Sequence, residues 1–225
     1  MRLLMISLLA LFASLTLLIV GNSFLITLLG LRFSLLGIEA STIGMVMVCY
    51  SAGFVIGSLY ADRIVRRVGH IRAFAVFAAL AAMAALIYPL TYNVWYWGIL
   101  RGIGGLTIAA LFITIESWFS AVATNANRSK IFSLYQVAAY SAAAGGQLLI
   151  GNGNPINYAL FTLSALFIIA GIIPLSLSRM HSPEISETTQ KMSLLQLVRL
   201  APLGVVAAFT GGIFLGSFYS LVPLF

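Results

Sequence analysis

Long apolar blocks separated by short polar segments are the main pattern along this chain. The first block runs from residue 3 to residue 31 without one ionisable side chain. A helix needs about 20 mainly apolar residues to cross a bilayer, because each residue advances about 1.5 Å along the axis. We find seven blocks of this kind and predict a membrane helix for each. They are residues 3–30, 41–61, 73–91, 94–119, 131–151, 156–178 and 200–225.

Helices are the expected structure for these blocks, because every backbone N–H and C=O must be bonded internally in lipid. The alternation of apolar and polar residues that marks a membrane β-strand is absent. Two boundaries are set by turn residues and not by charge. Pro89 and Asn93 separate the third and fourth blocks, and a GNGNP stretch at 151–155 separates the fifth and sixth.

Composition supports a membrane protein and excludes a soluble globular domain. Apolar residues make up 61% of the chain and charged residues 8%, with a mean hydropathy of +1.08; a soluble domain carries roughly 25% charged residues. The fold class that we predict is all-α, a polytopic membrane helical bundle of six helices plus a seventh span. Its first partner is the lipid bilayer.

Positive charge is in excess, with a formal net charge of +7. The cations lie in short clusters between apolar blocks and form no continuous basic stripe, so we expect no nucleic-acid partner. A single cysteine, Cys49, excludes an intrachain disulfide, and with only two histidines we expect neither a metal site nor a cofactor.

The distribution of Lys and Arg predicts the orientation. Cytoplasmic segments of membrane proteins carry the excess of both residues. If the N-terminus is cytoplasmic, ten cations lie inside, Arg32 alone lies outside, and Arg101 falls within a span. The ten are Arg2, Arg63, Arg66, Arg67, Arg72, Arg128, Lys130, Arg179, Lys191 and Arg199.

Two stretches combine charges with glycines at places where chemistry is expected. Residues 57–72 read GSLYADRIVRRVGHIR and join the second and third spans; Asp62 and Arg66 stand four residues apart and can pair on a helix. Residues 100–105 read LRGIGG in the fourth span. A guanidinium inside a span costs about 2.5–3.5 kcal/mol on insertion scales, so Arg101 should face the bundle interior or a wet cavity. The alternative is that it extends to the outer headgroups.

Two further stretches lie near helix ends. Residues 114–118 read TIESW, and Glu116 lies at the expected cytoplasmic end of the fourth span. Residues 211–223 read GGIFLGSFYSLVP, in which glycines, Tyr219 and Pro223 suit a helix that bends beside a cavity. Close helix packing through Gly212 and Gly216 is the alternative.

These four stretches together resemble the YcaD-like branch of bacterial transporters in the major facilitator superfamily. Transporters of this superfamily have two six-helix halves around a site near the bilayer midplane. The resemblance implies a secondary active transporter of a small solute, working by alternating access in efflux or in ion-coupled movement, with H⁺ as a candidate coupling ion. It also implies a bacterial inner-membrane location and no enzymatic activity.

The same resemblance suggests how the chain is divided. Residues 1–178 are expected to form the N-terminal six-helix domain, 179–199 a cytoplasmic linker, and 200–225 the first helix of an incomplete second domain. We therefore expect a partial transporter that needs a second half.

Site residues follow in two groups. The candidates for the substrate cavity and for coupling are polar or aromatic residues within spans: Arg101, Asn22, Gln136, Tyr140, Gln147 and Tyr219. The candidates for a cytoplasmic gate surround the 57–72 stretch: Asp62, Arg63, Arg66, Arg67, Gly69, Glu116 and Arg128. The resemblance implies that Glu116 faces the basic loop and pairs with Arg63, Arg67 or Arg128 when the inner side closes. A static pair that anchors the loop is the alternative.

Other function classes fit less well. A seven-span receptor or sensor would have its C-terminus outside if the N-terminus is inside, opposite to the usual receptor arrangement. A membrane fragment without transport activity is a further alternative. An intramembrane enzyme needs paired acids, Ser with His, or metal ligands at depth, and the spans hold none of these.

Overall fold

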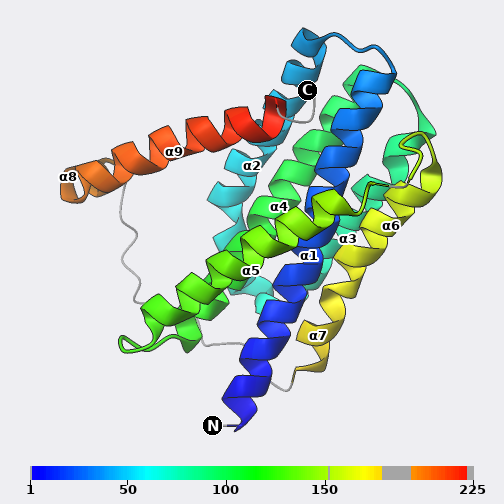
Figure 1. The fold of residues 1–225 in the computed structure, drawn as a ribbon. Helices are drawn as coiled ribbons and strands as arrows, with labels where there is room; N and C mark the ends of the chain where they lie inside the picture. Colours follow the sequence, from blue (N-terminus) through cyan, green and yellow to red (C-terminus); the bar gives the residue numbers. More distant parts are fainter. Residues whose placement is uncertain (1, 152, 179–193, 222–225) are drawn as a thin grey trace. The chain divides into compact units, whose positions relative to one another are not determined.

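The computed structural model describes residues 2–151, 153–178 and 194–221 (Figure 1). The chain divides into two compact units, Met1–Pro183 and Glu184–Phe225. The first unit contains α1 (Arg2–Leu35), α2 (Ala40–Val68), α3 (His70–Ile87), the 3₁₀ turn η1 (Tyr88–Leu90), α4 (Val94–Val122), α5 (Arg128–Leu148), α6 (Tyr158–Ala170) and α7 (Ile172–Leu177). The second unit contains α8 (Leu194–Leu200) and α9 (Pro202–Leu221).

Every predicted apolar block contains a helix, and the all-α fold class is confirmed for the described residues. Five of the described helical segments are long and apolar enough to cross a membrane. α5 is not among them, because its glutamines, serines, tyrosines and glycines keep its mean hydropathy low even without Arg128 and Lys130. The described apolar part of α9, Pro202–Phe214, is also shorter than a full span.

The helices differ from the predicted spans mainly at their ends. The second helix continues to Val68, so Asp62 and three arginines that we assigned to a loop lie on its last two turns. The sixth span is broken at Gly171 into α6 and α7. Pro174 explains the break, because it has no N–H to donate to the carbonyl group four residues earlier. Residues 194–199, expected in the linker, belong to α8.

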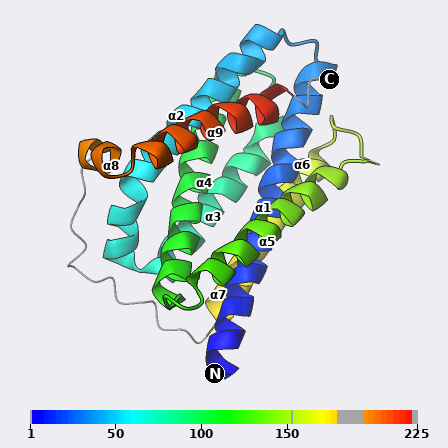
Figure 2. The same cartoon turned by 60° about the vertical axis from the view of Figure 1, so that its left-hand side comes forward.

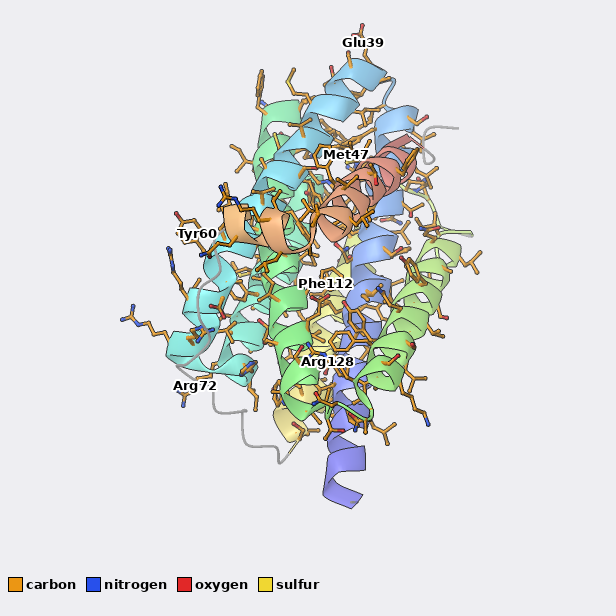
Figure 3. The ribbon with its side chains drawn as sticks, turned by 90° about the vertical axis from the view of Figure 1, so that its left-hand side faces the viewer. Glu39, Met47, Tyr60, Arg72, Phe112 and Arg128 are labelled. Atoms are coloured by element: carbon orange, nitrogen blue, oxygen red, sulfur yellow. The ribbon has the colours of Figure 1, made fainter. Side chains whose placement is uncertain are left out.

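The first unit is built from two pairs of helices and a second layer. α2 packs along α4, and α5 packs along α1. α3 and α6 pack against each other, with α3 against α4 and α6 against α1 (Figures 1 and 2). Seen from one side, α2 and α5 therefore flank α4 and α1 (Figure 3). We call this surface the α2–α5 face.

Glycines set the close approach of the paired helices. A Cβ atom on Gly53 would overlap the carbonyl oxygen of Gly102, and one on Gly105 would overlap that of Tyr50. Gly146 of α5 lies in the same way against the backbone of α1. These glycines are required at the contacts, because only a residue without a side chain lets two helix backbones come this near.

Gly69 alone separates α2 from α3. Its φ of 86° lies in the left-handed region, which residues with a Cβ atom rarely adopt. Its N–H donates to the carbonyl oxygen of Val65 and its own carbonyl accepts from Ala73 N–H, so one residue closes both helices. This position therefore requires glycine for backbone geometry, independently of any role in a gate.

Arg32, which the charge pattern assigned to the outer side of the membrane, is buried at 1% exposure in the last turn of α1. The guanidinium lies 5.2 Å from the ring centre of Tyr92 and 5.0 Å from that of Phe161. Its Nη1 donates to the carbonyl oxygen of Ile156 at 3.4 Å. The helix continues through Arg32 to Leu35, which carries this cation into an aromatic cluster instead of into solvent.

Candidate functional site

Arg101 lies inside the bundle, on α4, seven residues after the first residue of that helix and about 10 Å along its axis. Its side chain is 3% exposed. Nη2 donates to Met47 Sδ at 3.0 Å, and the guanidinium carbon lies 4.7 Å from the ring centre of Tyr50. Both partners come from α2. The fourth helix thus presents its cation to the second helix, where the glycine contacts hold the two backbones together.

The groups around Arg101 are aromatic and neutral. The phenol of Tyr88, in η1 directly after α3, lies near the guanidinium. The Tyr50 phenol interacts with the side chain of Asn22, which is half-buried on α1. Residues from α1, α2, η1 and α4 therefore meet at this point. Of the cavity candidates, Arg101 and Asn22 belong to this cluster.

No carboxylate in the described part of the chain pairs with Arg101. The described acids are Glu39 at the start of α2, Asp62 in its last turns, and Glu116 near the end of α4. Asp62 pairs with Arg66 and Glu116 accepts a bond from Tyr135. Arg101 is consequently a buried cation whose nearest partners carry no formal charge.

The remaining described cavity candidates lie on α5. Gln136, Tyr140 and Gln147 are all exposed in the first unit, whereas Tyr135 and Gly146 make the contact with α1 and α4. The structure therefore does not bring these three side chains to Arg101. They lie on a helix at the edge of the α2–α5 face (Figure 3).

Glu116 accepts a hydrogen bond of 2.7 Å from the hydroxyl group of Tyr135 on α5. Among the described residues it forms no ion pair with Arg63, Arg67 or Arg128. Arg63 lies over Tyr60 at 5.1 Å and Arg128 over Phe132 at 5.9 Å. One side chain thus connects the end of α4 to the start of α5.

The 57–72 stretch forms the end of α2, the Gly69 link and the start of α3. Asp62 Oδ2 accepts a bond of 2.8 Å from Arg66 Nε, which confirms the pairing predicted from their spacing. His70 is buried; its Nε2 lies 3.0 Å from Ser117 Oγ, and its ring packs against Trp118. The stretch is therefore attached to α4 through His70, next to Glu116. Figure 3 shows that Arg72 and Arg128 both lie toward the end of the bundle opposite Glu39.

Two of the predicted features lie outside the residues that the structure describes. Residues 179–193 of the predicted linker are not described. Tyr219 belongs to α9, but its side chain lies outside the described residues, as does Pro223.

Sequence reasoning missed the partners of both key charges, which are Met47 and Tyr50 for Arg101 and Tyr135 for Glu116. Met47 and Tyr50 stand three residues apart and share one face of α2. That spacing was visible, but nothing in it pointed to the fourth helix. In residues 2–151, 153–178 and 194–221, no three His, Cys, Asp or Glu side chains are grouped so that they could hold a metal ion.

Comparison with known proteins agrees with this architecture. A family model for the Major Facilitator Superfamily matches residues 4–225. An uncharacterized MFS-type transporter, YcaD, of Escherichia fergusonii is 31% identical over 185 residues, covering 81% of this chain and 48% of the relative. The YcaD protein of Salmonella enteritidis is 27% identical over 216 residues, covering 96% of this chain and 56% of the relative.

The chain spans about half the length of these relatives. Its apolar helices make it a multi-pass membrane protein. The match covers nearly the whole chain, including the 57–72 stretch, Arg101 and Glu116. This chain belongs to the major facilitator superfamily and, within it, is similar to the YcaD-type transporters.

Proposed function

We propose that this chain is the first half of a secondary active transporter that moves a small solute across a bacterial inner membrane by alternating access. The observation that carries the proposal is the polarity of the α2–α5 side of the unit. Arg101 lies just behind α2, and exposed Gln136, Tyr140 and Gln147 occur on α5. Lipid does not solvate amides or guanidinium groups, so such residues line water-filled cavities or contact other helices.

A second six-helix half is the partner that we propose for this surface. The relatives are about twice as long as the matched region. In the proposed arrangement, residues 1–178 form the first domain, 179–199 the linker, and 200–225 the first helix of the second domain. Rocking of the two halves about the Arg101 region would expose it first to one side of the membrane and then to the other.

The proposed inner gate lies at the end of the bundle where α2 meets α3. This end contains the last turns of α2 and the Gly69 link, with Asp62, Arg63, Arg66 and Arg67. It also contains Glu116 near the end of α4 and Arg128 at the start of α5. The bond between Tyr135 and Glu116 supports a switch, because it gives the carboxylate a neutral partner that an arginine could replace. If the Glu116 carboxylate left the Tyr135 hydroxyl group and paired with an arginine instead, the two arrangements would be the two states that a gate requires. With H⁺ as the coupling ion, Glu116 would be the acid in this half that takes up the proton.

The proposed orientation places the basic end of the bundle in the cytoplasm. In a Cys49→Ser background, a cysteine at Arg72 should resist a membrane-impermeant maleimide in intact cells and react in everted vesicles. A cysteine at Asn157, in the link before α6, should show the reverse pattern. Both positions are exposed in the structure, so access depends on the side of the membrane. Equal labelling of both from outside would contradict the orientation and the transport proposal built on it.

Transport itself is tested with membrane vesicles that contain the complete gene product to which residues 1–225 belong. A mixture of small solutes is supplied under an imposed proton gradient, and the vesicle contents are compared by mass spectrometry with those of empty vesicles. We expect at least one solute to change its distribution, and the change to disappear when an uncoupler is added.

Vesicles that contain residues 1–225 alone are the matched control. They should show no transport, because one half has no partner against which to alternate. Movement of a solute by residues 1–225 alone would contradict the need for a second half. Absence of any movement by the complete gene product would contradict the transport function.

A further inference from the structure

Arg101 leaves one side of its guanidinium without an adequate acceptor. Nε is buried and has no hydrogen-bond partner. Nη2, on the same edge of the planar group, donates to the thioether of Met47, which is a weak acceptor. Nε and Nη2 together form the fork with which arginine binds a carboxylate or phosphate through two parallel bonds. The structure thus holds a buried two-donor edge that is occupied by a single sulfur atom.

Arg32 is also buried with unpartnered nitrogens, but its surroundings are different. It lies in the last turn of α1, where the helix dipole places partial negative charge, and it donates to the Ile156 carbonyl group. Arg101 is in the interior of α4, where the backbone carbonyls are used within the helix. Arg32 therefore has backbone compensation for its charge, and Arg101 has only two tyrosines and Met47.

Met47 is suited to give way to a ligand. Its side chain is half-buried and lies on the α2–α5 face, where Figure 3 labels it. A methionine side chain has three rotatable bonds and no strong polar group, so it can leave the guanidinium at little cost. Tyr50 and Tyr88 would remain in place and offer their rings and hydroxyl groups to a ligand that enters. The position of Met47 Sδ is where one oxygen of an anion would bind.

We propose that Arg101 binds the anionic group of the transported solute, a carboxylate, phosphate or sulfonate, and that Met47 occupies this position when the site is empty. Two parallel charge-assisted bonds from Nε and Nη2 would hold the anion. The identification of the anion as cargo rests on the transport function proposed above. The anion site itself lies entirely within the described residues and is testable without transport.

The first test places a carboxylate at the proposed position from within the chain. Met47→Glu should bring an acid of similar length to the Nε–Nη2 edge, and Met47→Gln is the neutral control of the same size. We expect the midpoint of thermal unfolding of residues 1–225 in detergent, followed by circular dichroism, to be higher for Met47→Glu than for Met47→Gln. Equal or lower stability of Met47→Glu would overturn the proposal, and neither variant removes Arg101.

The second test measures binding directly. Radiolabelled benzoate serves as the probe, with unlabelled benzamide and benzylamine as neutral and cationic competitors of the same size. Purified residues 1–225 in dodecyl maltoside, which has no phosphate group, should bind benzoate in a scintillation proximity assay, and only unlabelled benzoate should compete. Arg101→Gln should weaken binding at least about tenfold, the loss expected when a hydrogen bond to a charged group is removed. Met47→Glu should abolish it, while Arg32→Gln should leave it unchanged.

An anionic lipid headgroup carries the same chemistry as a solute phosphate, and nanodiscs distinguish the two sources. Benzoate binding that is equal in phosphatidylcholine and phosphatidylglycerol nanodiscs supports a solute site. Binding that phosphatidylglycerol suppresses would assign the site to a lipid and overturn the proposal. Equal competition by benzamide, or unchanged binding by Arg101→Gln, would also overturn it.

The outcomes separate this inference from the transport function. If the complete gene product transports only neutral or cationic solutes and Met47→Glu transports them normally, the anion site is refuted and transport stands. If residues 1–225 bind benzoate through Arg101 but the complete gene product moves no solute, the anion site stands and the transport proposal is refuted.

Discussion

Replacing Gly53 with leucine is expected to prevent the first unit from reaching its native packing. A Cβ atom at this position would overlap the backbone of Gly102 on the facing helix, and no rotation of a flexible side chain can relieve a clash with backbone. α2 would have to move away from α4, which also breaks the contacts of Gly57 and Gly105 with the facing helix. Overpacking of a well-packed core costs about 1–3 kcal/mol and occasionally more; here a whole interface is displaced, so we expect a loss above this range.

The measurement is the yield of monodisperse protein on size-exclusion chromatography, together with thermal unfolding by circular dichroism. Gly104→Ala is the matched control, because a Cβ atom on Gly104 meets no atom within 4 Å although it lies next to Gly105 on the same helix. It should be neutral or stabilising by up to about 1 kcal/mol, the difference in helix propensity between glycine and alanine. Normal folding of Gly53→Leu would show that the approach of α2 and α4 is not required.

Replacing Arg101 with alanine is expected to reduce transport by the complete gene product at least about tenfold, since each 1.36 kcal/mol of lost binding corresponds to a factor of ten. The guanidinium connects the second, third and fourth helices and is the buried charge nearest to the proposed cavity. Insertion and folding should persist, because removing a charge from a span lowers the cost of insertion. The expected defect is therefore functional.

Uptake or release is measured with the solute found in the vesicle screen, after protein amounts are equalised by immunoblotting. Arg72→Ala is the control, since it removes an exposed cation outside the proposed cavity. Unchanged transport by Arg101→Ala would show that the guanidinium is dispensable and would contradict its role in the cavity. Loss of the folded protein would instead assign Arg101 a structural part in holding α2 and α4 together.

The charge pattern predicted one contact and did not predict another, and the difference depends on distance along the chain. Asp62 and Arg66 are one helical turn apart, so their pairing follows from helix geometry alone. Arg32 lies just beyond the predicted first span, but the helix continues past it to Leu35 and its guanidinium packs against Tyr92 and Phe161. Those rings belong to segments far from Arg32 in the sequence, and no local sequence pattern predicts the contact with them.

The small-residue patterns show the same limit. Gly53 and Gly57 indicate that something packs closely against α2, because their spacing places both on one face. They do not say which helix approaches. The structure assigns the contact to Gly102 and Leu106 of α4, and this contact in turn places Arg101 beside Met47 and Tyr50.

The sequence by itself determined the helical membrane fold and the approximate limits of the helices, because burial in lipid imposes length and apolarity on each span separately. The superfamily was indicated by the four motif stretches. Only the tertiary structure decided which neutral groups surround Arg101, that Glu116 is bonded to Tyr135, and that Gln136, Tyr140 and Gln147 stay exposed. Lipid is as apolar as the side chains between helices, so it does not select which faces meet. That selection comes from close packing and hydrogen bonds between distant segments.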